Sequence, residues 1–120
     1  MPPITRTLGN NLIVVELHGR FETTVAQDFI VWFNDLMLVD TPRVLVNLSN
    51  VKLMGSTGLT VLIYALKRLR ERRSDLYLCN VPVTVQQVFK LTRLNLVFTI
   101  FRDEAEARRA LSAAVDLNSL

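Results

Sequence analysis

Two adjacent hydroxyl side chains, Ser56 and Thr57, stand between Gly55 and Gly58, where an apolar strand leads into an amphipathic helix. A helix that begins here leaves backbone N–H groups without partners inside the helix, and such groups attract negative charge, including phosphate. A hydroxyl at this place is suited to accept a phosphate, or simply to cap the helix and stabilise it by about 1 kcal/mol. The two uses are compatible, since both draw on the same N–H groups.

Other catalytic or metal chemistry finds little support in the residue types. Cys79 is the only cysteine and lies in an apolar segment, so we expect a small core residue and neither a disulfide nor a cysteine metal cluster. His18 is the only histidine, and no spacing of carboxylates proposes a metal site. The sequence shows no nucleophile–base pair and no G-x-x-x-x-G-K phosphate loop. We therefore predict a protein that is not an enzyme and needs no cofactor or metal.

The positive charge of the chain is concentrated in one place. The formal net charge is +3 and the pI is about 9.5. Five basic residues gather near the end of a predicted helix: Lys67, Arg68, Arg70, Arg72 and Arg73. Basic side chains in a last helical turn complement the helix dipole, so we favour a solvated helix end over a nucleic-acid patch. A nucleic-acid partner is not expected.

Hydrophobic periodicity indicates the elements that must position these residues. Strands are predicted at Ile4–Leu8, Leu12–Leu17, Arg43–Leu48, Leu76–Asn80 and Val97–Ile100, and helices are predicted to begin near Thr24, Thr57, Pro82 and Asp103. The alternating order predicts an α/β fold with a mainly parallel sheet of four or five strands, an antiparallel N-terminal edge strand and four helices. We expect one domain over residues 1–120, with its core at about 4–115.

Local signals refine this prediction. Residues 12–17 present one wholly apolar and one partly polar face, which is typical of a sheet covered by helices mainly on one side. Residues 19–22 are expected to leave that strand as a loop. Capping-box spacing occurs at two predicted helix starts, at Thr24 with Gln27 and at Asp103 with Glu106.

The first predicted helix is more apolar than one buried face requires. Its expected core stripe consists of Val25, Phe29, Trp32, Phe33 and Leu36, and three further apolar residues widen it, namely Ile30, Val31 and Met37. A fully buried helix is the favoured interpretation, and an apolar surface that binds a partner is the alternative.

No segment is suited to cross or enter a membrane. No apolar run reaches the roughly 18 residues that a membrane span needs. The first six residues also lack the apolar centre of a signal peptide. We therefore expect a cytoplasmic protein without membrane insertion.

Three stretches of the chain resemble the STAS domain, the fold of bacterial anti-sigma factor antagonists. The most specific is Val46–Val51 followed by Leu53–Leu59, which is similar to the family pattern DLS-x-V-x-F-M-D-S-[ST]-G-L. Gly19–Glu22 stands at the place of the family's G-[ER]-[LF]-D loop. Residues 91–107 look like the family's L-x-L-T-G-L ending and the acidic start of its last helix. The resemblance covers nearly the whole chain.

The resemblance implies a partner-switching mechanism. In this family a partner serine kinase, the anti-sigma factor itself, phosphorylates the first serine of the motif, and a metal-dependent phosphatase reverses the modification. The unphosphorylated form binds the kinase and frees the sigma factor, which regulates transcription. Ser56 would be the phosphoacceptor, with Thr57 as the weaker candidate. The implied partner-binding residues are Gly19, Arg20, Phe21, Glu22, Thr23, Met54, Gly55, Ser56, Thr57 and Gly58.

The chain also departs from the family pattern. The family usually has Asp at the positions of Asn47, Gly55 and Glu22, and a glycine is common at the position of Arg93. A second use of the same fold is therefore kept as an alternative, in which a STAS accessory subunit of a lipid-transport ABC complex holds a transporter ATPase without phosphorylation. Gly55 and the apolar first helix favour this alternative slightly.

Overall fold

The computed structural model describes residues 3–9 and 11–119, with side chains described as far as residue 112. Its elements follow the predicted order. They are β1 Ile4–Leu8, β2 Leu12–Phe21, α1 Thr23–Val39, β3 Arg43–Met54, α2 Ser56–Glu71, β4 Leu76–Cys79, α3 Val83–Leu91, the 3₁₀ helix η1 Leu94–Leu96, β5 Thr99–Phe101 and α4 Glu104–Ser119.

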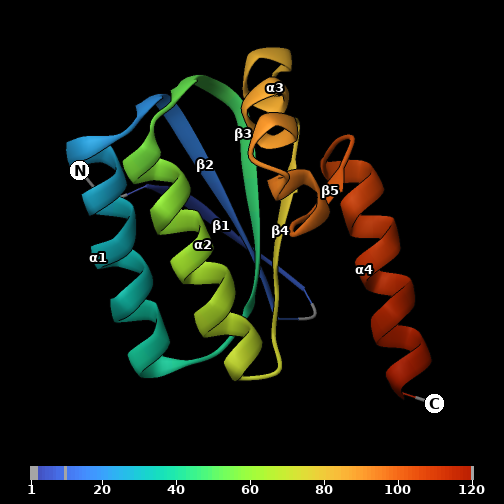
Figure 1. Cartoon of the computed structure of the whole chain (residues 1–120). Coiled ribbons are helices and arrows are strands. Elements are labelled where there is room, and N and C mark those ends of the chain that lie inside the picture. The colour runs from blue at the N-terminus through green and yellow to red at the C-terminus, as the bar shows by residue number, and fades with distance from the viewer. Residues whose placement is uncertain (1–2, 10, 120) are drawn as a thin grey trace.

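The five strands form one sheet in the order β1-β2-β3-β4-β5. β1 pairs with β2 in antiparallel orientation, and the other neighbouring pairs are parallel. The predicted α/β fold, with its antiparallel edge strand and four helices, is thereby confirmed (Figure 1). Asn10, in the expected turn between the first two strands, lies outside the described residues.

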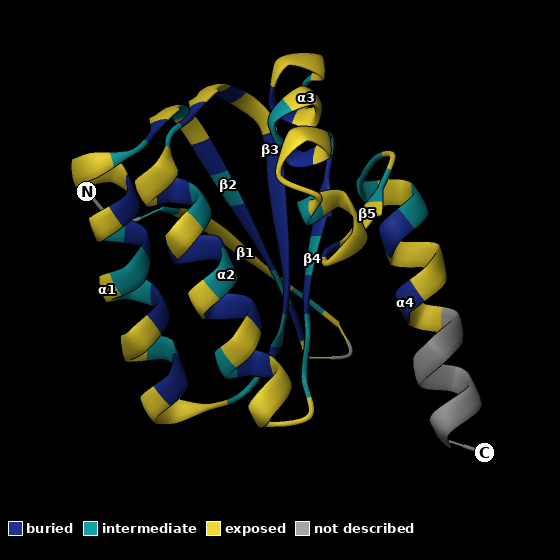
Figure 2. Ribbon diagram, in the orientation of Figure 1, coloured by how far each residue is buried: buried dark blue, intermediate teal, exposed yellow. Residues whose placement is uncertain are grey.

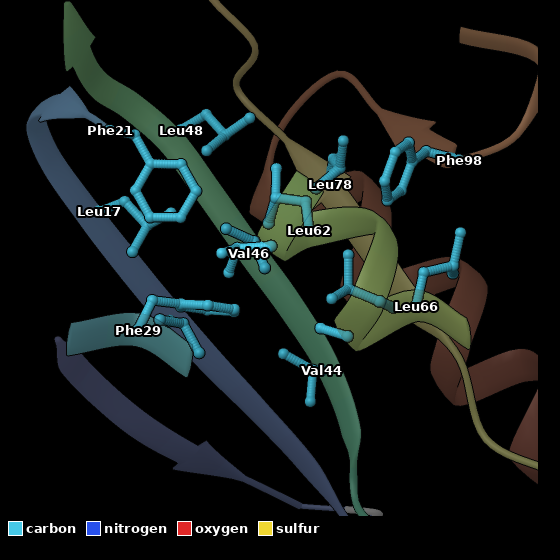
Figure 3. Packing of buried hydrophobic residues seen from close by; sticks show 14 of the residues in the cluster. Leu17, Phe21, Phe29, Val44, Val46, Leu48, Leu62, Leu66, Leu78 and Phe98 are labelled. Atoms are coloured by element: carbon cyan, nitrogen blue, oxygen red, sulfur yellow. The ribbon is translucent and has the colours of Figure 1, made fainter. Parts of the chain in front are cut away.

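Helices cover the two faces of the sheet unequally. The larger core cluster packs α1, α2 and α3 against one face, where Phe21, Phe29, Val46 and Leu62 meet (Figure 3). The smaller cluster packs α4 against the other face through Ala107 and other residues. In Figure 2 the central strands are largely buried, while the outer sides of α1 and α2 are exposed. This arrangement confirms the predicted sheet covered mainly on one side.

Two strands run further than the sequence indicated. β2 continues to Phe21 and β3 to Met54, because these ends pair with each other in parallel after two irregularities in register. The expected loop at residues 19–22 is therefore wrong for its first three residues, which belong to β2. Pairing with a neighbouring strand supplies backbone hydrogen bonds that local sequence signals do not reveal.

The start and the core stripe of α1 also differ from expectation. The helix begins at Thr23, and its N-cap residue Glu22 makes no side-chain capping bond, so the predicted capping box at Thr24 and Gln27 is wrong. The buried residues are Ala26, Phe29, Phe33 and Met37. Val25, expected in the stripe, is 38% exposed, because the helix is rotated so that Ala26 takes the buried place.

Helix α4 starts as the sequence predicted. The Asp103 carboxylate accepts a hydrogen bond from the backbone N–H of Glu106 at 2.8 Å, and this bond lowers the pKa of Asp103. The Glu106 carboxylate reaches back to the N–H of Arg102 at 3.1 Å, one residue earlier than in a standard capping box. The predicted capping pair is confirmed.

None of the helices in the described part of the chain has the length and apolar character needed to cross a bilayer.

Candidate functional site

The two segments that the sequence singled out lie side by side. Arg20 pairs with Leu53 and Phe21 with Met54 at the ends of β2 and β3. The backbone N–H of Gly55 then donates to the Phe21 carbonyl at 3.2 Å. Figure 1 shows α1 and α2 beginning at the same end of the molecule, directly after these strands. We call residues 19–23 and 54–58 together the Ser56 surface.

The start of α2 is open. Gly55 occupies the N-cap position without a side-chain capping bond, and the first turn contains no acidic residue. The first intrahelical bond runs from the Leu59 N–H to the Gly55 carbonyl at 3.0 Å. Among the described residues, no acceptor meets the N–H groups of residues 56–58. These donors and the helix dipole make this end of α2 favourable for an anion.

Both hydroxyls at this helix start are accessible. Ser56 and Thr57 are exposed, and neither hydroxyl has a hydrogen-bond partner in the described part of the chain. The interpretation that they cap α2 is wrong, because the N-cap residue is Gly55 and Ser56 is already the first helical residue. The Ser56 carbonyl does accept a bond from the Thr60 hydroxyl at 2.9 Å. The side-chain oxygen of Ser56 therefore remains available for chemistry.

Glycine is required at position 58 by close packing. A Cβ at Gly58 would lie 2.1 Å from the Phe21 carbonyl oxygen and 3.1 Å from the Met54 sulfur. No real side chain fits at such distances, so the missing Cβ lets the first turn of α2 rest directly on the end of β2. This contact sets the distance between the two halves of the Ser56 surface.

Gly55 is crowded for a different reason. A Cβ at this residue would lie 2.6 Å from the Glu22 Cβ and 2.8 Å from the Glu22 Oε2. The Glu22 carboxylate is held there by Arg20, whose Nη2 lies 2.9 Å from its Oε1. A carboxylate thus stands beside the start of α2, and it comes from the segment that follows β2.

The residues of the Ser56 surface fall into two groups by exposure. Phe21, Met54 and Gly58 are buried, so they can only position their neighbours. Those that are exposed are Arg20, Thr23, Ser56 and Thr57, and those that are half-buried are Gly19, Glu22 and Gly55. Thr23 has a φ of 43°, a left-handed conformation that is unfavourable for a β-branched residue. Strain of this kind often marks functional segments, but it assigns no role by itself.

The basic cluster near the end of α2 is partly used inside the molecule. Arg72 donates to the Met37 carbonyl at 2.6 Å, which ties α2 to α1. Arg70 pairs with Asp75 at 3.1 Å and also donates to the Val97 carbonyl at 3.1 Å. These contacts favour the interpretation of a solvated, structurally engaged helix end over a nucleic-acid patch.

One polar group of the core was missed by the sequence reasoning. Asn47 is only 8% exposed, donates to the Glu104 carboxylate at 2.9 Å and accepts from the Ser49 N–H at 2.9 Å. Arg6 also donates to Glu104, and this hydrogen bond is the main reason why the pKa of Arg6 is raised. The network joins β1, β3 and α4. No local pattern could reveal it, since its members are far apart in sequence.

Neither the lone cysteine nor the acidic groups build a second site. Cys79 is fully buried, as expected, and burial raises the pKa of its thiol to about 12. Among the described residues, no three His, Cys, Asp or Glu side chains come together as a metal site would require. The Ser56 surface is therefore the candidate site.

The sequence matches a protein-family model and is similar to a named bacterial protein. Residues 3–107 match the model of the STAS domain. The chain is 31% identical over 72 residues to BtrV of Bordetella bronchiseptica, whose name assigns it provisionally to the anti-sigma factor antagonists. This match spans 60% of the present chain and 59% of BtrV.

Solved structures have the same fold. A STAS domain protein of Planctomyces limnophilus, named for anti-sigma factor antagonists, superposes with a TM-score of 0.82 at 20% identity, covering 93% of this chain and 99% of that one. Unphosphorylated SpoIIAA, an anti-sigma factor antagonist known from Bacillus, gives a TM-score of 0.77 at 16% identity, covering 92% and 96%. At these identities the likeness supports the fold alone.

Proposed function

The chain belongs to the STAS domain family, and from this premise we propose that it is a binding module switched by reversible phosphorylation of Ser56. It is an anti-sigma factor antagonist-like STAS protein, and this family consists of non-enzymatic regulatory proteins. The proposed partner is an anti-sigma factor that is also a serine kinase. The unphosphorylated chain binds this kinase, and the phosphorylated chain releases it.

The observation that carries this proposal is the unengaged Ser56 hydroxyl at the open start of α2. A phosphate there would gain the free N–H groups of the first turn. The same phosphate would add nearly two negative charges to a surface that must pack closely against a partner. Phosphorylation at Ser56 is thus compatible with the folded chain and unfavourable for the complex, which is what a release switch requires.

The chain needs no catalytic groups of its own for this cycle. The γ-phosphoryl group of ATP passes to the Ser56 Oγ, the hydroxyl proton goes to a base of the kinase, and ADP leaves. Magnesium, nucleotide and base all belong to the kinase. A phosphatase then transfers the phosphoryl group to water and restores the hydroxyl.

The test uses purified chain, Mg-ATP and each small histidine-kinase-like serine kinase of the source genome. Intact-mass spectrometry should show one added phosphate with the partner kinase. Ser56→Ala should abolish this addition, while Thr57→Ala, the matched control on the neighbouring hydroxyl, should retain it. The proposal fails if no kinase modifies the wild-type chain, or if Ser56→Ala is modified as fully as wild type.

The extra apolar residues of α1, which favoured the transporter alternative, give it less support in the structure. Met37 is 4% exposed and Ile30 packs against the core, so two of the three extra apolar residues of α1 serve the fold. Of these three residues, only Val31 is exposed, at 61%. A pull-down that recovers a transporter ATPase in place of a serine kinase would nevertheless decide for this alternative.

A further inference from the structure

The space beside Ser56 that a side chain at position 55 would fill is taken by Glu22. The Glu22 Oε2 lies 2.8 Å from the place of a Cβ at Gly55. Consecutive Cα atoms are about 3.8 Å apart, so an anionic group on Ser56 falls within roughly one screening length, about 8 Å, of this carboxylate. Glu22 and a modified Ser56 therefore repel each other.

Among the described residues, the Glu22 carboxylate is held by one cation, Arg20, which lies in the same segment. The Arg20 Nε donates to the Glu22 Oε1 at 2.9 Å, and the Arg20 Nη2 lies 2.9 Å from the same oxygen. Glu22 is half-buried and Arg20 is exposed, so this pair is free to rearrange at the surface. Helix α2 contributes no acidic residue to its own first turn. Glu22 is thus the carboxylate that faces this helix start.

We propose that Glu22 senses the charge on Ser56 and transmits it to the segment between β2 and α1. This inference rests on the proposed function and names the residue that links the two halves of the Ser56 surface. A phosphate on Ser56 drives the Glu22 carboxylate out of the space beside Gly55, and Arg20 is released from it to face the phosphate. Phosphorylation of Ser56 then changes both segments of the Ser56 surface, residues 19–23 as well as residues 54–58, although the phosphate is attached only to the second.

The first test needs no partner. Ser56→Asp places one negative charge at the helix start, where the dipole favours it and Glu22 opposes it. The effect of Ser56→Asp on the folding equilibrium constant is measured by urea unfolding in two backgrounds. It should be about five-fold more favourable to the folded state when position 22 is Gln than when it is Glu. Glu71→Gln, which removes an exposed carboxylate from the other end of α2, should leave the effect of Ser56→Asp unchanged. Additive effects of Ser56→Asp and Glu22→Gln would overturn the proposal.

A spectroscopic readout separates charge sensing from a merely structural role. The NMR signal of the Arg20 Nε–H reports the bond to Glu22 directly. It should shift when Ser56→Asp is introduced, and the shift should be absent in the Glu22→Gln background. An Arg20 signal that is insensitive to Ser56→Asp would contradict the proposed rearrangement.

The partner arm distinguishes this inference from the proposed function. With the kinase in hand, phosphorylation should weaken its binding to the wild-type chain about five-fold more than its binding to Glu22→Gln. If no kinase modifies Ser56 while the unfolding cycle shows coupling, the proposed function fails and the link between Glu22 and Ser56 stands. If Ser56 is phosphorylated but phosphorylation weakens kinase binding equally in wild type and in Glu22→Gln, the proposed function stands and the inference fails.

Discussion

Helices α2 and α4 begin in opposite ways. At α4, Asp103 and Glu106 each accept a backbone N–H, and Glu104 is held by Asn47 and Arg6. At α2, the N-cap residue is a glycine and no side-chain capping bond forms. The same chain thus closes one helix start with its own side chains and leaves the other open.

This difference agrees with the role that we propose for the start of α2. A capping side chain stabilises a helix by about 1 kcal/mol, and α2 forgoes this stabilisation at a place where two hydroxyls are exposed. The closed start of α4 fixes that helix on the second face of the sheet. The open start of α2 retains free donors beside Ser56, as our proposed phosphoacceptor would need.

At the open start, the largest loss of stability is expected from a change that pushes the first turn of α2 away from β2. In Gly58→Ala the new Cβ meets the Phe21 carbonyl oxygen at 2.1 Å, so backbone must move against backbone. We expect the free energy of unfolding to fall by about 3 kcal/mol, measured by urea denaturation. Gly9→Ala is the control, because nothing lies within 4 Å of its Cβ. Equal stability of Gly58→Ala and wild type would mean that this close approach does not exist.

At the closed start, the corresponding change is Asn47→Ala. It removes the buried amide that donates to Glu104 and leaves the Ser49 N–H without its 2.9 Å acceptor. We expect the free energy of unfolding to fall by about 2 kcal/mol, since half-satisfied buried polar groups are unfavourable. Ser49→Ala, which keeps its backbone N–H, serves as the control in the same denaturation assay. A neutral Asn47→Ala would show that α4 is anchored without the network.

The contrast between the two starts was only partly predictable from sequence. The capping spacing of Asp103 and Glu106 is a local signal, and it was sufficient to predict how α4 begins. The occupation of the space beside Gly55 by Glu22 depends on strands β2 and β3 pairing to their last residues, which local periodicity does not encode. Asn47 and Glu104 are 57 residues apart, so their bond follows from the packing of α4. Family resemblance supplied the role of Ser56, and that role stays a prediction.

A smaller change in the free energy of unfolding is expected when a capping side chain is introduced at the start of α2. An Asp at position 55 could cap α2, but in wild type it would collide with Glu22. Both atoms that block this space, the Glu22 Cβ and Oε2, are absent when glycine stands at position 22. Gly55→Asp should therefore destabilise the wild-type chain, whereas in a Glu22→Gly background it should raise the free energy of unfolding by about 1 kcal/mol. Denaturation of the four variants of this cycle measures both values. A stabilising Gly55→Asp in wild type would show that Glu22 does not occupy this space.

The smallest expected effect is a pH dependence at the closed start. The N–H of Glu106 lowers the pKa of Asp103 below its ordinary value of 3.8. A carboxyl with a lowered pKa in the folded state stabilises above the ordinary value, and this contribution is lost as the pH falls through the folded pKa. The thermal midpoint of wild type should therefore exceed that of Asp103→Asn near neutral pH, and the two should converge below pH 3.8.

Because Asn is itself a good capping residue, this pair of proteins isolates the charge of Asp103 from its hydrogen bond. Ser56→Asp offers the matching measurement at α2, since it puts a titratable group on the start that lacks one. If Glu22 opposes that new carboxylate, its advantage over Ser56→Asn above pH 4 should be smaller than that of Asp103 over Asn. An equal advantage at both helices would mean that the open start of α2 differs from α4 only in lacking a cap, and that Glu22 exerts no repulsion there.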